Sequence, residues 1–115
     1  MNFYTLNIGD REFDARLSTR DVVNLEKKLG TNPLNILMSM QEGGLPQTGV
    51  LLTIVQAAAK EGGKTLKMDL WFDLYDEFIA EGNSITDLLE IVVEIFQVSG
   101  LIPEEEEGAE ADIKN

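Results

Sequence analysis

Apolar and polar residues alternate over residues 3–17 with the period of two that is typical of half-buried β-strands. The alternation is interrupted at Gly9 and Asp10, a pair that suits a two-residue type II′ turn with glycine first. The pattern therefore predicts a β-hairpin. Because a lone hairpin is marginally stable in water, we expect it to pack on the rest of the chain. The alternating apolar sets are Tyr4, Leu6 and Ile8 in the first strand and Phe13, Ala15 and Leu17 in the second.

After the hairpin the apolar period becomes that of α-helices, and capping residues divide the chain into five of them. Ser18, with Asp21 three residues later, predicts the start of the first helix, and Gly30 predicts its end. Asn32 and Pro33 predict the start of the second. The expected helices cover about residues 18–29, 33–41, 47–60, 69–81 and 84–99, with a loop at 61–68. The sequence thus predicts an α+β, mainly α fold, an N-terminal β-hairpin followed by a bundle of about five helices.

The residues after Pro103 differ in composition from the rest of the chain. Residues 104–115 include six acidic residues, one basic residue and a single large apolar residue, Ile113. This segment has too little apolar surface to offset the entropy of ordering, so the sequence predicts a disordered acidic tail. The total length fits one domain. We therefore expect a single hairpin-plus-helical-bundle domain over residues 1–103 and a tail over residues 104–115.

The last three predicted helices carry more apolar surface than a surface helix needs. The last two are apolar over about half of their circumference, and the helix at 47–60 has few polar residues, whereas a surface helix needs an apolar stripe of about 100°. Either the hairpin and the first helix cover all of this surface within one chain, or one face meets another protein. On the last helix, the candidate self-association residues are Ile91, Ile95 and Val98.

The second predicted helix is the best candidate for a partner-binding surface. It follows a corner, a change of chain direction that Gly30, Asn32 and Pro33 define. Most of its residues are apolar, and few polar residues interrupt them. Methionine side chains adapt to varied partners, although filling a gap in the core is their commoner role. Recognition of a helix by a groove requires an apolar surface of this kind. The candidate partner-binding residues are Leu34, Leu37, Met38 and Met40, with Leu45 in the following loop.

The formal net charge of −12 is distributed unevenly. Residues 1–68 contain eight basic and seven acidic residues, whereas residues 69–115 contain one basic and fourteen acidic residues. We expect no binding to nucleic acid, because that affinity comes from Lys and Arg at phosphates. The acidic half could attract a basic partner or orient one copy of the chain against another, or it could serve solubility alone. Residues 1–10 lack the basic start and long apolar run of a signal peptide, and no apolar window comes close to the roughly 20 residues of a membrane span. We therefore expect a cytoplasmic protein without a signal peptide or membrane contact.

Catalytic and metal-binding chemistry has little support in the sequence. The chain contains no Cys and no His, which removes the common nucleophile, general base and transition-metal ligands. Asp69, Asp73 and Asp76 share one helix face, where a solvated acidic surface is a better interpretation than a Mg²⁺ or Ca²⁺ site. The GGKT segment at 62–65 resembles the end of the phosphate-binding motif G-x-x-x-x-G-K-[ST]. The first glycine of that motif would be residue 58, which is Ala58. We expect no enzyme activity, no metal and no cofactor.

Two segments of the chain resemble a known family. They are LEKKLGTNPLNIL at residues 25–37 and YDEFIAEGNSITDLLEIVVEIFQVSG at residues 75–100. With the hairpin and the acidic end, they resemble the tail assembly chaperones of long-tailed bacteriophages and prophages of Gram-positive hosts, over about residues 1–102. The resemblance implies a protein that coats the tape measure protein, keeps it soluble and helps recruit tail tube subunits. It also implies action in the host cytoplasm and absence from the mature virion.

Three further expectations concern partners and alternatives. The surplus apolar surface predicts a homo-oligomer. An acidic DNA mimic that blocks a nucleic-acid-binding protein is one alternative, and its complex would be lost at moderate salt. A helical adaptor or scaffold protein without a phage role is the other. Neighbouring genes for tail tube and tape measure proteins would favour the chaperone over both.

Overall fold

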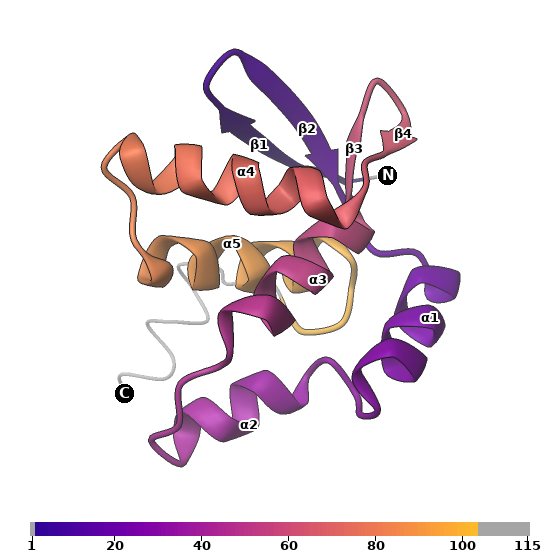
Figure 1. Ribbon diagram of the computed structural model, residues 1–115. Helices are drawn as coiled ribbons and strands as arrows, with labels where there is room; N and C mark the ends of the chain where they lie inside the picture. The colour runs from indigo at the N-terminus through magenta and orange to yellow at the C-terminus, as the bar shows by residue number, and fades with distance from the viewer. Residues whose placement is uncertain (1, 104–115) are drawn as a thin grey trace, which may run out of the picture.

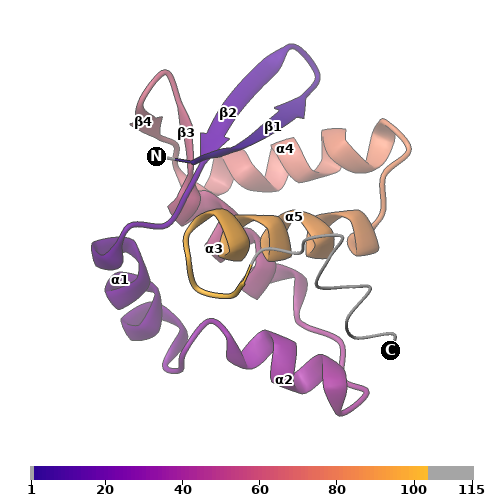
Figure 2. The same ribbon diagram turned by 180° about the vertical axis from the view of Figure 1, so that it is seen from behind.

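The computed structural model describes residues 2–103 of the 115-residue chain (Figure 1, and Figure 2 from behind). A hairpin precedes the helices, so the predicted α+β, mainly α fold is confirmed. The predicted tail at 104–115 lies outside the described residues. The strands are β1 (Tyr4–Ile8), β2 (Arg11–Ala15), β3 (Ala59–Glu61) and β4 (Lys64–Thr65), and the helices are α1 (Thr19–Leu29), α2 (Asn35–Gln41), α3 (Thr48–Ala58), α4 (Met68–Ala80) and α5 (Ile85–Val98).

The hairpin forms as the alternation predicts. Strands β1 and β2 pair antiparallel, and Ile8 faces Arg11 across the two-residue turn. Gly9 has φ 58° whereas Asp10 has a negative φ, which is the type II′ pattern with glycine first. The Gly9 N–H donates a hydrogen bond of 2.7 Å to the Glu81 carboxylate just after α4, so the turn is tied to the helical layer.

The sheet has two more strands than the sequence predicted. Helix α3 ends at Ala58, and the next residues pair with β2, with Ala59 opposite Ala15 and Lys60 opposite Asp14. Strand β4 completes a four-stranded sheet in the order β1-β2-β3-β4. The prediction of helix to residue 60 and loop at 61–68 is therefore wrong for β3 and β4. Three consecutive alanines favour helix locally, but pairing with β2 supplies hydrogen bonds that a local pattern does not reveal.

An ion pair holds β3 beside β2. The Arg11 guanidinium donates two hydrogen bonds to the Glu61 carboxylate, each 2.8 Å long. The hydrogen bond with Arg11 lowers the pKa of Glu61, and the same bond raises the pKa of Arg11. Such bidentate pairing is geometrically specific, because Nε and Nη2 of Arg11 must align with both carboxylate oxygens of Glu61.

Helix α3 lies at the centre of the molecule. It packs against α1, α4 and α5, and Figures 1 and 2 show it between these helices. Its buried side chains are Leu51, Leu52, Ile54, Val55 and Ala58. Helix α2 lies at the end of the molecule away from the sheet in both views, and it contributes a single buried residue, Ile36.

Helix α5 is covered largely within the chain. Ile95 is fully buried and Ile91 is only 6% exposed, so two of the three residues predicted to form a self-association face lie in the core. That prediction is corrected for Ile91 and Ile95, because the sheet and α3 already occupy their surroundings. Val98 is half-buried, and its carbonyl oxygen accepts a hydrogen bond of 2.7 Å from Arg16.

Candidate functional site

The corner before α2 begins at a glycine, as the sequence predicted. Gly30 has φ 73°, and its N–H donates a 2.9 Å hydrogen bond to the carbonyl oxygen of Glu26. This is a left-handed C-cap, which an L side chain adopts at a cost. At the other end of α1, Ser18 and Asp21 form the predicted capping box, with hydrogen bonds of 2.9 and 3.1 Å. Helix α1 is therefore fixed at both ends, and so is the direction in which the chain leaves it.

The second half of the corner is a capped, tight first turn. The Asn32 side-chain oxygen accepts a hydrogen bond of 2.9 Å from the Leu34 N–H, so Asn32 caps the turn that precedes α2, while the N-cap of the regular helix is Leu34. The next bonds join residues three apart, from Ile36 to Pro33 and from Leu37 to Leu34. This tight geometry moves the start of the regular helix to Asn35, two residues after the predicted start. Pro33 is fully buried and anchors the corner to the core.

The end of α2 is closed by its own backbone. The Gly44 N–H donates to the Ser39 carbonyl oxygen at 2.8 Å, and the Gly43 N–H donates to the Met40 carbonyl oxygen at 3.0 Å. This pair of bonds is the Schellman motif, which satisfies carbonyl groups that a helix end leaves free. The loop from residue 42 to residue 47 therefore leaves α2 in a defined direction.

The five candidate partner-binding residues divide into two groups. Met38 is 59% exposed and Leu45 is 87% exposed, so both reach the surface. Leu34, Leu37 and Met40 are half-buried and pack against the core. The structure thus presents an exposed pair supported by three residues that anchor α2. We call Met38, Leu45 and these three supporting residues the α2 surface.

The charge distribution around the α2 surface is a signal that the sequence analysis missed. Between Lys28 and Lys60 the chain carries one charged residue, Glu42. The segment includes all of α2, the following loop and α3. A segment with so few charges favours apolar contacts with a partner, because few of its own ions must be desolvated when it is covered.

A second set of exposed apolar side chains lies on α4 and at the start of α5. Phe72 is 49% exposed, and Ile79 and Ile85 are each 41% exposed. Phe72 and Ile79 are seven residues apart, so they share one flank of α4. Sequence reasoning recognised the wide apolar arc of α4 but did not identify which flank stays uncovered, because that depends on how α3 and the sheet dock.

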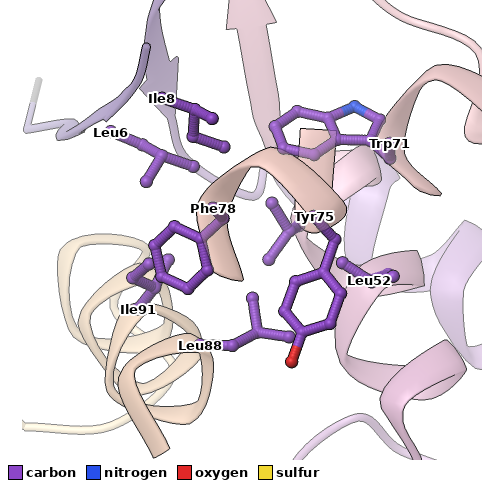
Figure 3. A pocket seen from close by; sticks show the side chains of 9 residues that line it. Leu6, Ile8, Leu52, Trp71, Tyr75, Phe78, Leu88 and Ile91 are labelled. Carbon is purple, nitrogen blue, oxygen red and sulfur yellow. The ribbon is translucent and has the colours of Figure 1, made fainter. Parts of the chain in front are cut away.

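The core cavity is too small to be a ligand site. Its volume is about 10 Å³, which is close to the space of one water molecule. Figure 3 shows the apolar side chains that surround it, contributed by the sheet, α3, α4 and α5. Trp71 and Phe78 point into this region, while the Tyr75 hydroxyl points away from it. We interpret the cavity as imperfect packing at the junction of four elements.

Metal and membrane features can be described for residues 2–103. Within this range, no three His, Cys, Asp or Glu side chains come together as a metal-binding group. Asp69, Asp73 and Asp76 are all exposed on α4. None of the helices described here has the length and apolar character needed to cross a bilayer.

Comparison with known proteins assigns the chain to a family but not to a characterised relative. No curated protein and no solved structure matches the chain. A family model described as a family of unknown function, DUF6096, matches residues 2–112. The match includes the corner, the α2 surface and the whole helical core. The chain belongs to the DUF6096 family.

Proposed function

We propose that this protein is a phage tail assembly chaperone, which binds the tape measure protein, keeps it soluble and helps recruit tail tube subunits. It acts in the host cytoplasm and is absent from the mature virion. The resemblance of residues 25–37 and 75–100 to such chaperones motivates the proposal.

The observation that carries the proposal is the exposure of Met38 and Leu45 on the α2 surface. A long helical client presents repeated apolar side chains that must be covered until the tail assembles. An adaptable methionine and an exposed leucine in a nearly uncharged segment suit a client whose sequence varies along its length. The half-buried Leu34, Leu37 and Met40 hold α2 in place while the exposed pair makes contact.

The test replaces Met38 and Leu45 with Asp in one variant. Both side chains are exposed, so the variant is expected to fold and to keep its thermal midpoint within a few degrees. Co-expression with the tape measure protein then measures how much of that protein stays soluble. We expect a large loss of soluble tape measure protein, because two charges on an apolar contact surface must be desolvated on binding.

The matched control is Val23→Asp on α1. Val23 is also an exposed apolar residue, at 42%, but it lies outside the α2 surface. The control is expected to keep the tape measure protein soluble. A folded Met38→Asp, Leu45→Asp variant that solubilises the client as well as the unchanged protein would contradict this assignment of the client-binding surface.

A further inference from the structure

A groove of about 450 Å³ lies between strand β1 and helix α5. Residues 4–7 of β1 form one wall, and α5 forms the opposite wall. The inner part is apolar, because the buried side chains of Leu6, Phe78 and Ile91 line it. Figure 2 shows β1 and α5 on the same side of the molecule.

The β1 wall is an open strand edge. Strand β1 is the outer strand of the sheet, with β2 on its inner side. Ile8 and Arg11 close the two-residue turn as a hydrogen-bonded pair, so Ile8, Leu6 and Tyr4 bond to β2. The alternate residues, Thr5 and Asn7, therefore direct their N–H and C=O groups away from β2. Among residues 2–103, neither residue makes a backbone hydrogen bond outside the sheet.

The α5 wall is acidic. Asp87, Glu90 and Glu94 follow one another at spacings of three and four residues, so they form a row on one helix face. Glu90 and Glu94 are exposed, and the residues in the range 2–103 that line the groove include no Lys or Arg. Burial raises the pKa of Tyr4 in β1, and the Glu94 and Glu90 carboxylates raise it further. The negative potential of these two carboxylates therefore reaches β1.

The two walls have matching repeats. Glu90 and Glu94 are separated by about 6 Å along the helix. Alternate side chains of a β-strand are separated by about 6.8 Å and point to the same face. An extended chain that pairs with β1 therefore directs every second side chain toward the helical layer, at nearly the spacing of the two carboxylates.

We propose that this groove binds an extended basic segment of another protein, which adds a strand to β1 and places alternate Lys or Arg side chains against Glu90 and Glu94. Strand addition supplies the main-chain hydrogen bonds, and the carboxylates select basic side chains. The inference does not rest on the proposed chaperone function, because it uses another surface and no resemblance.

The first experiment uses the full chain and a short labelled peptide in which Lys alternates with Thr. Fluorescence anisotropy is expected to show saturable binding. Hydrogen exchange should show that the amides of Thr5 and Asn7 exchange readily in the free protein and become protected when the peptide is bound. Two further peptides carry N-methyl groups on the Lys amides or on the Thr amides. At least one is expected to bind roughly tenfold more weakly, because methylation removes the hydrogen bonds to β1 without changing the charge.

The second experiment compares two double variants with the same change in net charge. Glu90→Gln with Glu94→Gln should weaken peptide binding roughly fivefold or more, because both opposing charges are lost. The control is Asp73→Asn with Asp76→Asn, two exposed residues on α4 that do not line the groove, and it should change binding by less than about twofold. All four side chains are exposed, so both variants should fold.

Several results would overturn the proposal. They are the absence of saturable binding by the Lys peptide, equal weakening by the two double variants, and undiminished binding of both N-methylated peptides. Protection of the Thr5 and Asn7 amides in a dimer without peptide would also overturn it, because a second copy of the chain would then occupy the edge.

Discussion

Trp71 is the largest fully buried side chain, and it carries an unpaired polar atom. Its Nε1 atom has no hydrogen-bond partner within the described residues, while its ring lies 4.9 Å from that of Phe13. An unpaired buried donor costs about 1–3 kcal/mol. We therefore expect Trp71→Phe to lower the free energy of unfolding by less than about 2 kcal/mol, because it removes this donor along with some volume, whereas Trp71→Ala should lower it by about 3–5 kcal/mol. Urea unfolding measures both values.

The exposed neighbour of Trp71 provides the comparison. Phe72 is about half exposed, and Phe72→Ala should cost less than about 1.5 kcal/mol. If Trp71→Phe proves as costly as Trp71→Ala, then the indole N–H has a partner, such as an ordered water, and our account of this residue is wrong.

At the scale of elements, Arg16 joins the first and last parts of the domain. Its Nη1 atom donates a hydrogen bond of 2.7 Å to the carbonyl oxygen of Val98 at the end of α5. Helix α5 has no basic residue in its own last turn, so Arg16 supplies the cation that favours a helix C-terminus. We expect Arg16→Ala to lower the free energy of unfolding by about 1–2 kcal/mol, measured with urea.

Two variants check the role of Arg16. Arg16→Lys keeps the charge and should recover part of the loss. Arg20→Ala removes an exposed cation on α1 and should change stability by less than about 0.5 kcal/mol. Equal losses for Arg16→Ala and Arg20→Ala would indicate that only the net charge matters.

The ion pair between β2 and β3 predicts a dependence on pH. Because the pKa of Glu61 is lowered in the folded state, its contribution to stability is present above the unfolded pKa and is lost as pH falls through the folded pKa. The difference in thermal midpoint between the unchanged protein and Glu61→Gln should therefore shrink between pH 7 and about pH 3. Glu12→Gln, on the exposed face of β2, is the control and should show a smaller difference at pH 7. A difference for Glu61→Gln that stays constant over this range would contradict the ion-pair account.

Elements defined by local chemistry were predictable from the sequence, and elements defined by distant partners were not. The hairpin and the caps at Ser18 and Gly30 depend on neighbouring residues, and the structure confirms them. Strand β3 forms because it meets β2, more than 40 residues earlier in the chain, and no local pattern marks that meeting. The α2 surface was recognisable as an apolar run, but the division into exposed Met38 and half-buried Met40 depends on docking. The β1–α5 groove was not recognisable, because its walls come from opposite ends of the domain.

At the scale of the whole molecule, the core covers most of the apolar arc of the last three helices. Phe13, Ala15 and Leu17 of the hairpin segment are buried together with residues of α3, α4 and α5. One flank of α4 keeps Phe72 and Ile79 exposed, and Ile85 follows at the start of α5. Because Ile91 and Ile95 lie inside, this flank replaces the predicted α5 face as our candidate contact between copies of the chain.

We therefore expect self-association at micromolar concentration to depend on Phe72 and Ile79. Sedimentation velocity over a range of concentrations should show dimers or larger species, and these should persist in about 1 M salt, because salt screens charges and leaves apolar contacts intact. Replacing both residues with Gln should shift the protein toward the monomer, whereas Val23→Gln on α1 should not. Both replaced side chains are 41–49% exposed, so the folded state should tolerate the change. A protein that stays monomeric at every concentration would show that the exposed flank of α4 is not a contact between copies.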